Sequence, residues 1–418
     1  MKLSYLDQLT PHLYFPVIFF YQPNETKDLS TSNHVQISQH LKKSLSETLT
    51  SFYPLAGRIR DNFIIDCNDA GVKFIEARID AQLKDSIQKP NMENLNQYLP
   101  VDPAKGGLGN EATLLVVQIT FFDCGGISVG ICFSHKIGDC ASIMNFLNKW
   151  AATGRGDHQE AEISRVSFDL ANFFPARDFS SLFGFPRSDE NFTTKRFVFD
   201  KVKLAALRLQ VAVATSSSDS TKNPTNVELV SAFIWKIFIN NVAKYSNNLR
   251  GIKNVFAAFH AVNLRARISS PADDQYYLEN VFGNCIMSAL ATTNNTCNNT
   301  FHELVSKLRS SIRKISDDYI KKAENGDCYL NDLFGLISFL AKGELEYCRF
   351  SSWCSFPIYE VNYGWGNPIW VCTTALPLKN VIVLARSRCR EGIEAWINMN
   401  QDNLQVLETQ IQLISTNM

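Results

Sequence analysis

The sequence predicts an α/β protein built from two domains of similar size. At 418 residues the chain exceeds one ordinary hydrophobic core, so two domains of about 200 residues each are expected. Strand-like and helix-like hydrophobic periods alternate along both halves of the chain. A polar, Ser-rich stretch closed by a proline, residues 215–224, lies between the halves and is typical of a linker or an exposed loop.

In the first half, leucines that recur at every fourth residue indicate one amphipathic helix, and apolar runs separated by Gly-containing turns indicate strands. After Asp139 the hydrophobic period changes from that of a strand to that of a helix. The elements expected here are a helix over 33–52, a hairpin of 63–68 with 72–77, strands over 114–122 and 127–134, and a helix that follows Asp139.

The second half repeats this mixture. Thr225 and Glu228 fit a capping box ahead of the apolar helix LVSAFIWKIF. Further expected elements are a strand over 255–265, a helix over 301–315, strands over 380–386 and 393–399, and a short helix around 404–414. We therefore assign residues 1–190 to a first domain, 191–224 to a crossover or linker and 225–418 to a second domain.

Composition and charge narrow the class of protein. The chain is 45% hydrophobic and 20% charged, with 41 basic and 41 acidic residues, which argues against a nucleic-acid binder because phosphate neutralisation requires a basic surplus. No apolar run approaches the ~18 residues needed to span a bilayer. The apolar stretch Leu13–Tyr21 contains Pro16 and lacks a cleavage site, so it is a poor signal peptide. We predict a cytoplasmic protein with no membrane partner.

The eleven cysteines are scattered, odd in number and form no C-x-x-C pair. This pattern is typical of reduced cytosolic thiols and argues against a disulfide framework and against a zinc ribbon. No metal site is predicted.

The stretch SHKIGDC places His135 at the end of an apolar strand and Asp139 at the start of a helix. Asp139 suits a helix N-cap, and His135 has two interpretations, a buried histidine at a strand end or a general base. Strand ends that lead into helices are where α/β proteins place site residues. An imidazole with a pKa of ~6.5 can take a proton from an alcohol, whose own pKa lies near that of water, ~16. Asp139 would then hold the loop, by capping or through an arginine.

Two other nucleophile interpretations arise nearby. Residues 126–130, GISVG, match the G-x-S-x-G elbow of serine hydrolases, but that elbow requires a strand-to-helix turn at Ser128, and here the strand continues beyond it. Cys140 lies in the expected first helical turn, which would lower a thiol pKa, so a Cys–His pair is a further alternative.

The stretch SSWCSFPIYEVNYGWGNPIW, residues 351–370, contains Gly364 and Gly366 on either side of Trp365. Glycines supply backbone angles that other residues avoid, and the indole fills space. This segment is interpreted as mainly structural.

Taken together, these stretches resemble the plant BAHD family of acyl-CoA-dependent acyltransferases. The family's H-x-x-x-D motif corresponds to His135–Asp139, and its D-F-G-W-G motif to Asn362, Tyr363, Gly364, Trp365 and Gly366. The resemblance covers nearly the whole chain, through LSYLDQ, FYPLAGR, CNDAGVKFIEA, FDCGGISVG, AVNLRAR, SSWC and GIEAW in the family's order. Among subgroups, the chain is most similar to that of alkaloid, capsaicinoid and acylsugar acyltransferases.

The resemblance implies an α/β fold of two chloramphenicol-acetyltransferase-like domains, with mixed β-sheets flanked by helices and a channel between the domains. It implies that His135 is the general base and that the acceptor attacks acyl-CoA directly, without an acyl-enzyme. By the same resemblance Asp139 supports the base and pairs with Arg265, and Ser351 and Trp353 stabilise the oxyanion. Acyl-CoA is then a co-substrate, and no permanently bound cofactor is expected.

The chain departs from the family pattern at three positions. Asn362 replaces an aspartate expected to pair with an arginine, and a buried arginine without its carboxylate is costly. Tyr363 replaces phenylalanine and adds a hydroxyl that needs a partner, and Cys140 replaces a small residue. These changes affect stability and acceptor fit more than chemistry, because His135 is intact.

We predict a monomeric O-acyltransferase that moves an acyl group from acyl-CoA to a hydroxyl of a plant specialised metabolite, an alkaloid or a sugar ester. The alternatives are N-acylation of an amine and a catalytically silent binding protein of the same fold. Acceptor identity, acyl-chain length and the contacts to the CoA phosphates depend on channel shape, which the sequence does not specify.

Overall fold

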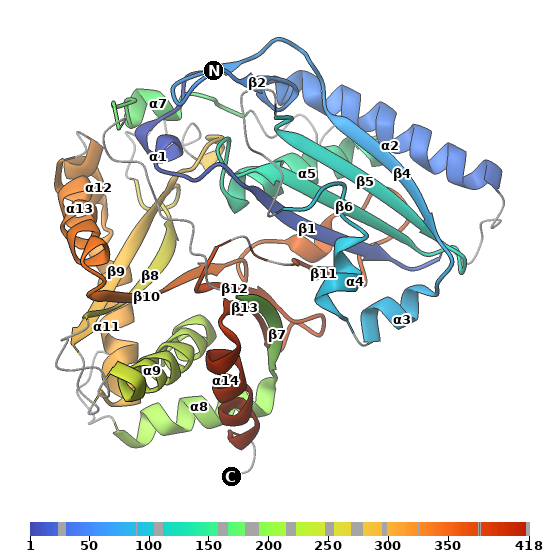
Figure 1. Ribbon diagram of the computed structural model, residues 1–418. Coiled ribbons are helices and arrows are strands. Elements are labelled where there is room, and N and C mark those ends of the chain that lie inside the picture. Colours follow the sequence, from blue (N-terminus) through green and yellow to red (C-terminus); the bar gives the residue numbers. More distant parts are fainter. Residues whose placement is uncertain are drawn as a thin grey trace. The chain divides into compact units, whose positions relative to one another are not determined.

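The computed structural model describes residues 1–23, 31–88, 90–103, 112–157, 166–179, 192–214, 223–246, 255–268, 279–294, 299–324, 327–374, 376 and 378–414. It is an α/β protein with two compact units, each containing a sheet (Figure 1). The first unit comprises Met1–Phe185, Ile268–Cys285 and Phe356–Pro377. The second comprises Pro186–Arg267, Ile286–Ser355 and Leu378–Met418.

The first unit contains a five-stranded sheet in which only β4 and β5 pair in parallel. Its strands, in spatial order, are β11 (Trp370–Cys372), β1 (Tyr14–Tyr21), β6 (Ile127–Ser134), β5 (Leu115–Phe122) and β4 (Lys73–Ile79). Strands β5 and β6 are buried at every position, as expected for strands covered on both faces. The strands predicted over 114–122 and 127–134 are confirmed.

Two long helices of the first unit, α2 (Thr31–Ser51) and α5 (Cys140–Arg155), pack against each other (Figure 1). The indole Nε1 of Trp150 in α5 donates hydrogen bonds to Leu41 O and Ser44 Oγ of α2, at 3.3 and 3.1 Å. Both helices were expected from their apolar stripes. The loop that contains His135 leads directly into α5. The packing of α5 against α2 therefore fixes the helix in which this loop ends.

The predicted hairpin of residues 63–68 with 72–77 is wrong. Strand β3 (Ile65–Asp66) pairs with β2 (Arg58–Ile59), and β4 pairs in parallel with β5. Asp69 and Gly71 adopt left-handed backbone angles, with φ of 53° and 78°, and Gly71 N donates to Ala56 O. The turn therefore leads the chain to a different sheet, where the apolar β5 provides a better partner than β3.

The second unit contains a mixed six-stranded sheet in which β10 is parallel to both of its neighbours and the other pairs are antiparallel. Its order is β7 (Thr193–Phe199), β13 (Ile393–Met399), β12 (Val381–Arg386), β10 (Leu345–Ser352), β8 (Val255–Asn263) and β9 (Ile286–Asn294). The mixed sheets expected from the family resemblance are therefore present in both units.

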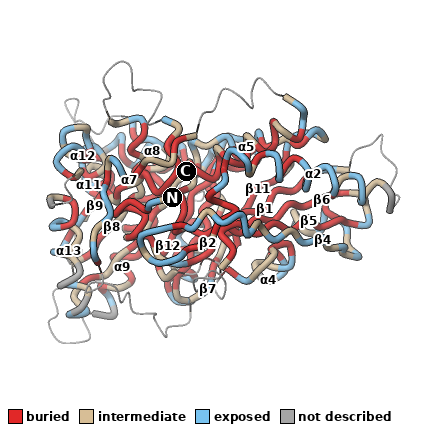
Figure 2. Tube along the Cα trace, turned by 90° about the horizontal axis from the view of Figure 1, so that it is seen from above, coloured by how far each residue is buried: buried red, intermediate tan, exposed pale blue. Residues whose placement is uncertain are grey.

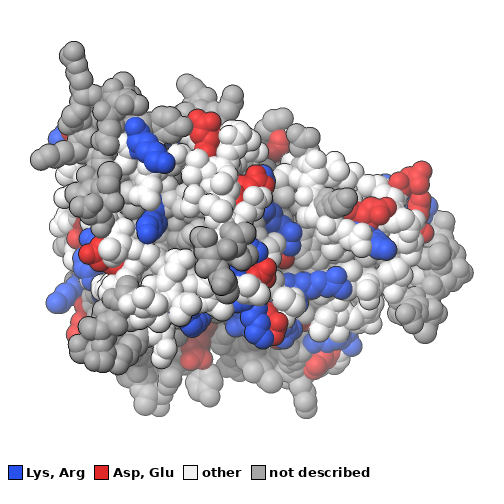
Figure 3. Space-filling model, turned by 90° about the horizontal axis from the view of Figure 1, so that it is seen from below, with Lys and Arg blue, Asp and Glu red and all other residues white. Residues whose placement is uncertain are grey.

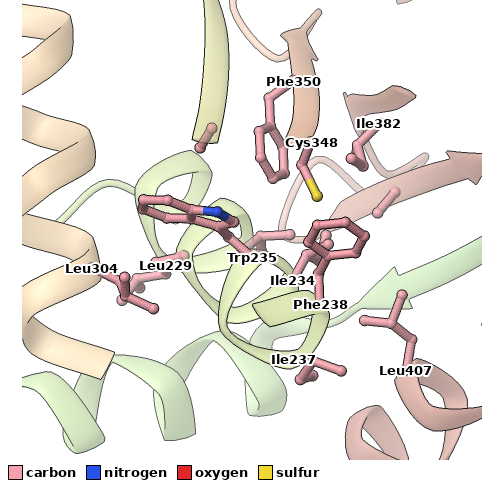
Figure 4. Packing of buried hydrophobic residues seen from close by; sticks show 14 of the residues in the cluster. Leu229, Ile234, Trp235, Ile237, Phe238, Leu304, Cys348, Phe350, Ile382 and Leu407 are labelled. Carbon is pink, nitrogen blue, oxygen red and sulfur yellow. The ribbon is translucent and has the colours of Figure 1, made fainter. Parts of the chain in front are cut away.

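A hydrophobic cluster joins this sheet to its helices, and Figure 4 shows its centre at Trp235 of α9 (Asn226–Ser246). Leu229 and Leu304 lie on one side of the indole, and Cys348 and Phe350 of β10 lie on the other. The predicted capping box is present, since Thr225 N donates to Glu228 Oε2 and Glu228 N donates to Thr225 Oγ1. The other helices of this unit are α8 (Lys201–Ala214), α11 (Phe301–Lys314), α12 (Asp317–Glu324), α13 (Asp327–Ala341) and α14 (Gln401–Leu413).

The units differ from the predicted domains of 1–190 and 225–418. The predicted linker, 191–224, contains β7 and α8 of the second unit, and its Ser-rich part, residues 215–222, lies outside the described residues. Two later segments return to the first unit, because β11 pairs with β1 and because residues up to Cys285 contact the loop after β6. Pairing between distant segments, rather than order along the chain, sets the boundaries.

Burial and charge follow these elements. Figure 2 shows buried residues along the strands of both sheets and exposed residues on the outer faces of helices such as α2. On the face in Figure 3, described Lys and Arg side chains are interspersed with Asp and Glu. No described helix is both long and apolar enough to cross a membrane.

The remaining short helices are α1 (Tyr5–Gln8), α3 (Leu83–Gln88), α4 (Met92–Asn96), α7 (Leu170–Phe173) and the 3₁₀ turns Tyr53–Ala56 and Ile358–Glu360.

Candidate active site

His135 follows the last residue of β6, at the point where the strand ends and the chain turns toward α5. Its backbone N donates to Leu13 O at 2.9 Å, which continues the pairing of β6 with β1 by one further bond. The imidazole lies edge-on to the Phe15 ring, with centroids 4.7 Å apart. The residue is partly buried and lies just beyond the strand end.

The contacts of the ring define its tautomer. His135 Nδ1 lies 3.2 Å from the backbone O of Gly138. A carbonyl oxygen only accepts hydrogen bonds, so Nδ1 must carry the proton. In the neutral imidazole the lone pair is then on Nε2. The loop therefore selects Nε2 as the nitrogen that can accept a proton.

Burial lowers the pKa of His135 below its ordinary value of 6.5, and this effect outweighs the Gly138 carbonyl, its own carbonyl, Asp139 and Asn284, which all raise it. The imidazole is accordingly neutral at pH 7. A neutral imidazole with a defined tautomer is the form required of a general base.

Asp139 caps α5. Its Oδ1 accepts a hydrogen bond from Ser142 N at 2.9 Å, and its side chain is buried. This confirms the N-cap interpretation, which stabilises a helix by about 1 kcal/mol. Arg265 belongs to the second unit, where its Nη1 donates to Asn263 Oδ1 at 3.1 Å. Pairing of Asp139 with Arg265 stays a prediction.

Ser351 and Trp353 lie at the end of β10 in the second unit. Ser351 is paired with Val383 of β12, and Trp353 N donates to Leu384 O at 2.7 Å. The indole of Trp353 is buried. Their predicted role at the oxyanion stays a prediction.

The Asn362–Gly366 segment is a tight turn that Asn362 holds together. Asn362 Oδ1 accepts hydrogen bonds from Gly364 N at 2.9 Å and Gly366 N at 3.0 Å. Both glycines have φ near +105°, at 106° and 105°, which other residues rarely adopt. Arg155 Nη1 donates to the backbone O of Asn362 at 2.6 Å. Asparagine thus provides the acceptor that this turn requires, and the contact from Arg155 needs no carboxylate.

Tyr363 is fully buried among aromatic rings. Its ring centroid lies 4.8 Å from Trp150 and 5.6 Å from Trp365. Among the described residues its hydroxyl has no hydrogen-bond partner. The expected need for a partner is therefore unmet, and the contacts of Tyr363 support a structural role for the motif.

Of the two alternative nucleophiles, the structure excludes Ser128, and the Cys140 alternative stays a prediction. Ser128 lies inside β6, fully buried and opposite Phe20 and Thr120 of the neighbouring strands, so the strand-to-helix turn of a serine hydrolase is absent at this residue. Cys140 is the first residue of α5 and is partly buried. Among the residues that the structure describes, no group of three or more His, Cys, Asp or Glu side chains could hold a metal ion.

Sequence reasoning missed three buried polar residues beside His135, namely Asp7, Lys136 and Asn284. Asn284 Nδ2 donates to His135 O, and Lys136 Nζ donates to Gln8 O. A local signal exists only for Asp7, whose carboxylate closes a capping box with Ser4 at the start of α1. Nothing near Asn284 in the sequence indicates its contact with His135, which is 149 residues away.

Known proteins match this sequence over nearly the whole chain. The family model described as Transferase family matches residues 1–414. The chain is 41% identical over 416 residues to stemmadenine O-acetyltransferase of Catharanthus roseus, covering 98% of this chain and 91% of the relative. It is also 41% identical over 418 residues to vinorine synthase of Rauvolfia serpentina, with the same coverage of 98% and 91%.

Solved structures also match nearly the whole chain. The crystal structure of vinorine synthase superposes with a TM-score of 0.81 at 38% identity, covering 99% of this chain and 93% of that one. A protein of F. graminearum, crystallised with coenzyme A and deoxynivalenol, has a TM-score of 0.71 at 14% identity, with coverage of 98% and 97%. The second likeness shows a shared fold.

Proposed function

The chain belongs to the Transferase family, the BAHD acyl-CoA-dependent acyltransferases, and from this premise we propose which acceptor it takes and how His135 acts. The protein transfers an acyl group from acyl-CoA to a hydroxyl group of a plant specialised metabolite. The proposed acceptor is an alkaloid or a sugar ester, and His135 is the general base. The observation that carries the mechanism is the hydrogen bond between His135 Nδ1 and Gly138 O, because it leaves Nε2 as the proton acceptor.

The proposed reaction has two proton transfers at one nitrogen. Nε2 of His135 takes the proton of the acceptor hydroxyl as the oxygen attacks the thioester carbonyl, and the C–O bond forms. The tetrahedral intermediate then expels CoA, and the imidazolium returns the proton to the leaving thiolate. General-base catalysis of this kind contributes about 10²- to 10⁴-fold in rate. No covalent acyl-enzyme forms, because the acceptor itself is the nucleophile.

The alkaloid acceptor is supported by the name of one relative, stemmadenine O-acetyltransferase, which is 41% identical over nearly the whole chain. In the proposed assembly Ser351 and Trp353 donate to the oxyanion, and Asp139, paired with Arg265, supports the base. Acyl-CoA is the co-substrate, with no permanently bound cofactor. The protein acts as a cytoplasmic monomer, and its partners are small molecules only.

The test measures release of free CoA thiol across a panel of acyl-CoAs, with and without plant alcohols such as deacylated alkaloids and partially acylated sugars. We expect release that depends on an acceptor, a product ester identified by mass spectrometry, and no mass gain on the protein when the acceptor is omitted. An amide product would establish N-acylation instead. A stable acyl-protein adduct would overturn direct attack, and binding of acyl-CoA without turnover on any acceptor would favour the silent binding protein.

A further inference from the structure

The loop from His135 to Ser142 is held by a short segment that lies far away in the sequence, residues 282–284. Gly283 O accepts hydrogen bonds from Ser142 Oγ at 2.8 Å and from Asp139 N at 3.3 Å. Gly283 N in turn donates to Ser142 Oγ at 3.0 Å. The segment therefore fixes the end of the loop at which α5 begins.

The other end of the loop is fixed by the side chain of Asn284. Its Nδ2 donates one hydrogen bond to His135 O at 2.9 Å and another to Asp7 Oδ1 at 2.9 Å. A primary amide has two N–H groups on this nitrogen, so both are used. The side chain is fully buried, and a reversed amide would place Oδ1 against a carbonyl and a carboxylate. Only one orientation of the amide is therefore compatible with its surroundings.

Asp7 sets that orientation. Its Oδ1 accepts from Asn284 N at 2.7 Å and from Asn284 Nδ2, and its Oδ2 accepts from Ser4 N at 2.9 Å and Ser4 Oγ at 2.6 Å. Each oxygen faces two donors, and these hydrogen bonds favour the carboxylate, whereas burial is the larger influence and raises the pKa of Asp7. A buried carboxylate requires a compensating charge nearby.

Lys136, the residue after His135, supplies that charge. Its ammonium is buried, and Nζ donates to Gln8 O at 2.7 Å and Thr10 O at 2.9 Å, just after Asp7 in the chain. Burial lowers the pKa of Lys136 to about 8, and the charge of Asp7 acts in the opposite direction. Lys136 and Asn284 thus connect residues 7–10 to the His135 loop.

We propose that Asn284 is the positioning residue of His135: oriented by Asp7, its side-chain amide fixes the His135 backbone so that Nδ1 meets the Gly138 carbonyl and Nε2 faces the substrates. Gly283 permits the approach, because it has a φ of 141° and an added Cβ would lie 2.6 Å from Leu170 Cδ2. The His135 backbone is thus held on both sides, its carbonyl by Asn284 and its N–H by the Leu13 carbonyl, which restricts its rotation. This inference rests on the proposed function, in which His135 is the base.

The experiment compares wild type with Asn284→Ala, Asp7→Asn and His135→Ala, and with Asn241→Ala as a matched control. Asn241 Nδ2 donates a buried hydrogen bond to Asn403 Oδ1 in the second unit, so its loss costs stability without touching His135. A displacement of about 1 Å at a catalytic group costs about 10²-fold in rate. We expect Asn284→Ala to lower kcat by about this factor with KM nearly unchanged, Asp7→Asn by about 10-fold, and Asn241→Ala not at all.

Two further readouts separate positioning from simple loss of stability. Asn284 itself raises the pKa of His135, but burial lowers it by more. Hydration of a loosened ring in Asn284→Ala should therefore outweigh the lost hydrogen bond and move the acid limb of kcat/KM up toward the ordinary histidine value of ~6.5. The ¹⁵N NMR signals of His135 should report the Nδ1–H tautomer in wild type and a mixture of tautomers in the variant.

The outcomes are distinct. Folded Asn284→Ala with wild-type kcat, pH profile and tautomer would overturn the positioning role. If that variant does not fold, Asp7→Asn, which keeps the side-chain volume, decides by the same readouts. Full activity in His135→Ala would overturn the proposed base instead, and the NMR tautomer would still decide whether Asn284 positions the ring.

Discussion

Two histidines, one in each unit, differ in burial and in what their rings can do, since His260 is buried and His135 only partly buried. His260 lies within β8 of the second unit, with its ring stacked on Phe350 at a centroid distance of 4.9 Å and an interplanar angle of 6°. Its Nε2 lies 2.9 Å from Ser231 Oγ. His135 lies just beyond the end of β6 in the first unit, with Nδ1 against a loop carbonyl. Burial lowers the pKa of both rings.

The comparison shows that a lowered pKa does not identify a catalytic histidine. A ring inside a strand is held between neighbouring strands and helices, and His260 is only 3% exposed. A ring at a strand end meets the loop that follows, which can select a tautomer and leave the other nitrogen accessible. The position in the sheet, rather than the titration, separates the proposed base from the core residue.

The largest effect is expected from His135→Ala. Loss of the proposed general base should lower kcat by about 10³-fold, while the free energy of unfolding changes by less than about 1 kcal/mol because the residue is only partly buried. Steady-state kinetics and urea unfolding measure the two quantities. Comparable loss of activity in His260→Ala, measured on folded protein, would contradict the difference expected between the two histidines.

His260→Ala should show the opposite balance. Removal of a buried aromatic ring and its hydrogen bond should destabilise the second unit by about 3 kcal/mol. The kcat of the folded fraction should stay within about twofold of wild type, because the contacts of His260 with Ser231 and Phe350 lie within the second unit, whereas His135 belongs to the first. Denaturant unfolding followed by activity assays at low temperature tests this. An inactive but fully stable variant would contradict it.

The pH dependence of stability sharpens the comparison further. Burial lowers the pKa of His260 from 6.5 to about 4. Between these values the unfolded chain binds a proton that the folded chain does not, so the free energy of unfolding falls as pH falls from 6.5 to 4. At about 1.4 kcal/mol per pKa unit, the loss at this site reaches about 3 kcal/mol.

His260→Gln removes this titration. The difference in unfolding free energy between wild type and His260→Gln should therefore shrink as pH falls through this window and become constant below pH 4. Urea unfolding of both proteins at several pH values is the measurement. A difference that is independent of pH would show that His260 titrates normally.

The smallest effect is expected from Ser231→Ala. The change removes the partner of His260 Nε2 and leaves a buried ring nitrogen without its hydrogen bond, at a cost of about 1 kcal/mol. Activity should be unchanged. Thermal unfolding should place this variant between wild type and His260→Ala, and a larger loss than that of His260→Ala would be inconsistent with the proposed order.

The sequence was sufficient for the elements around His135. The apolar runs of β5 and β6, the capping residue Asp139 and the stripe of α5 are local signals, and each is confirmed. It was insufficient where a strand had a choice of partners. The sequence predicts that β3 and β4 pair with each other, whereas β3 pairs with β2 and β4 with β5. It also could not reveal Asn284 beside His135, since no local pattern reports a contact between segments 149 residues apart.

The return of two late segments to the first unit has a consequence for how the protein is made. The hydrogen bond from Thr373 Oγ1 to Pro16 O spans 357 residues, and β11 completes the edge of the first sheet. Synthesis runs from the N-terminus, and domains usually fold in that order. Here the ribosome must deliver most of the second unit before the first can close. A chain that ended before residue 268 would therefore contain His135 and Asp139 but neither of the late segments that complete the first unit. The His135 loop can gain its hydrogen bonds to Gly283 and Asn284 only after those residues have been synthesised.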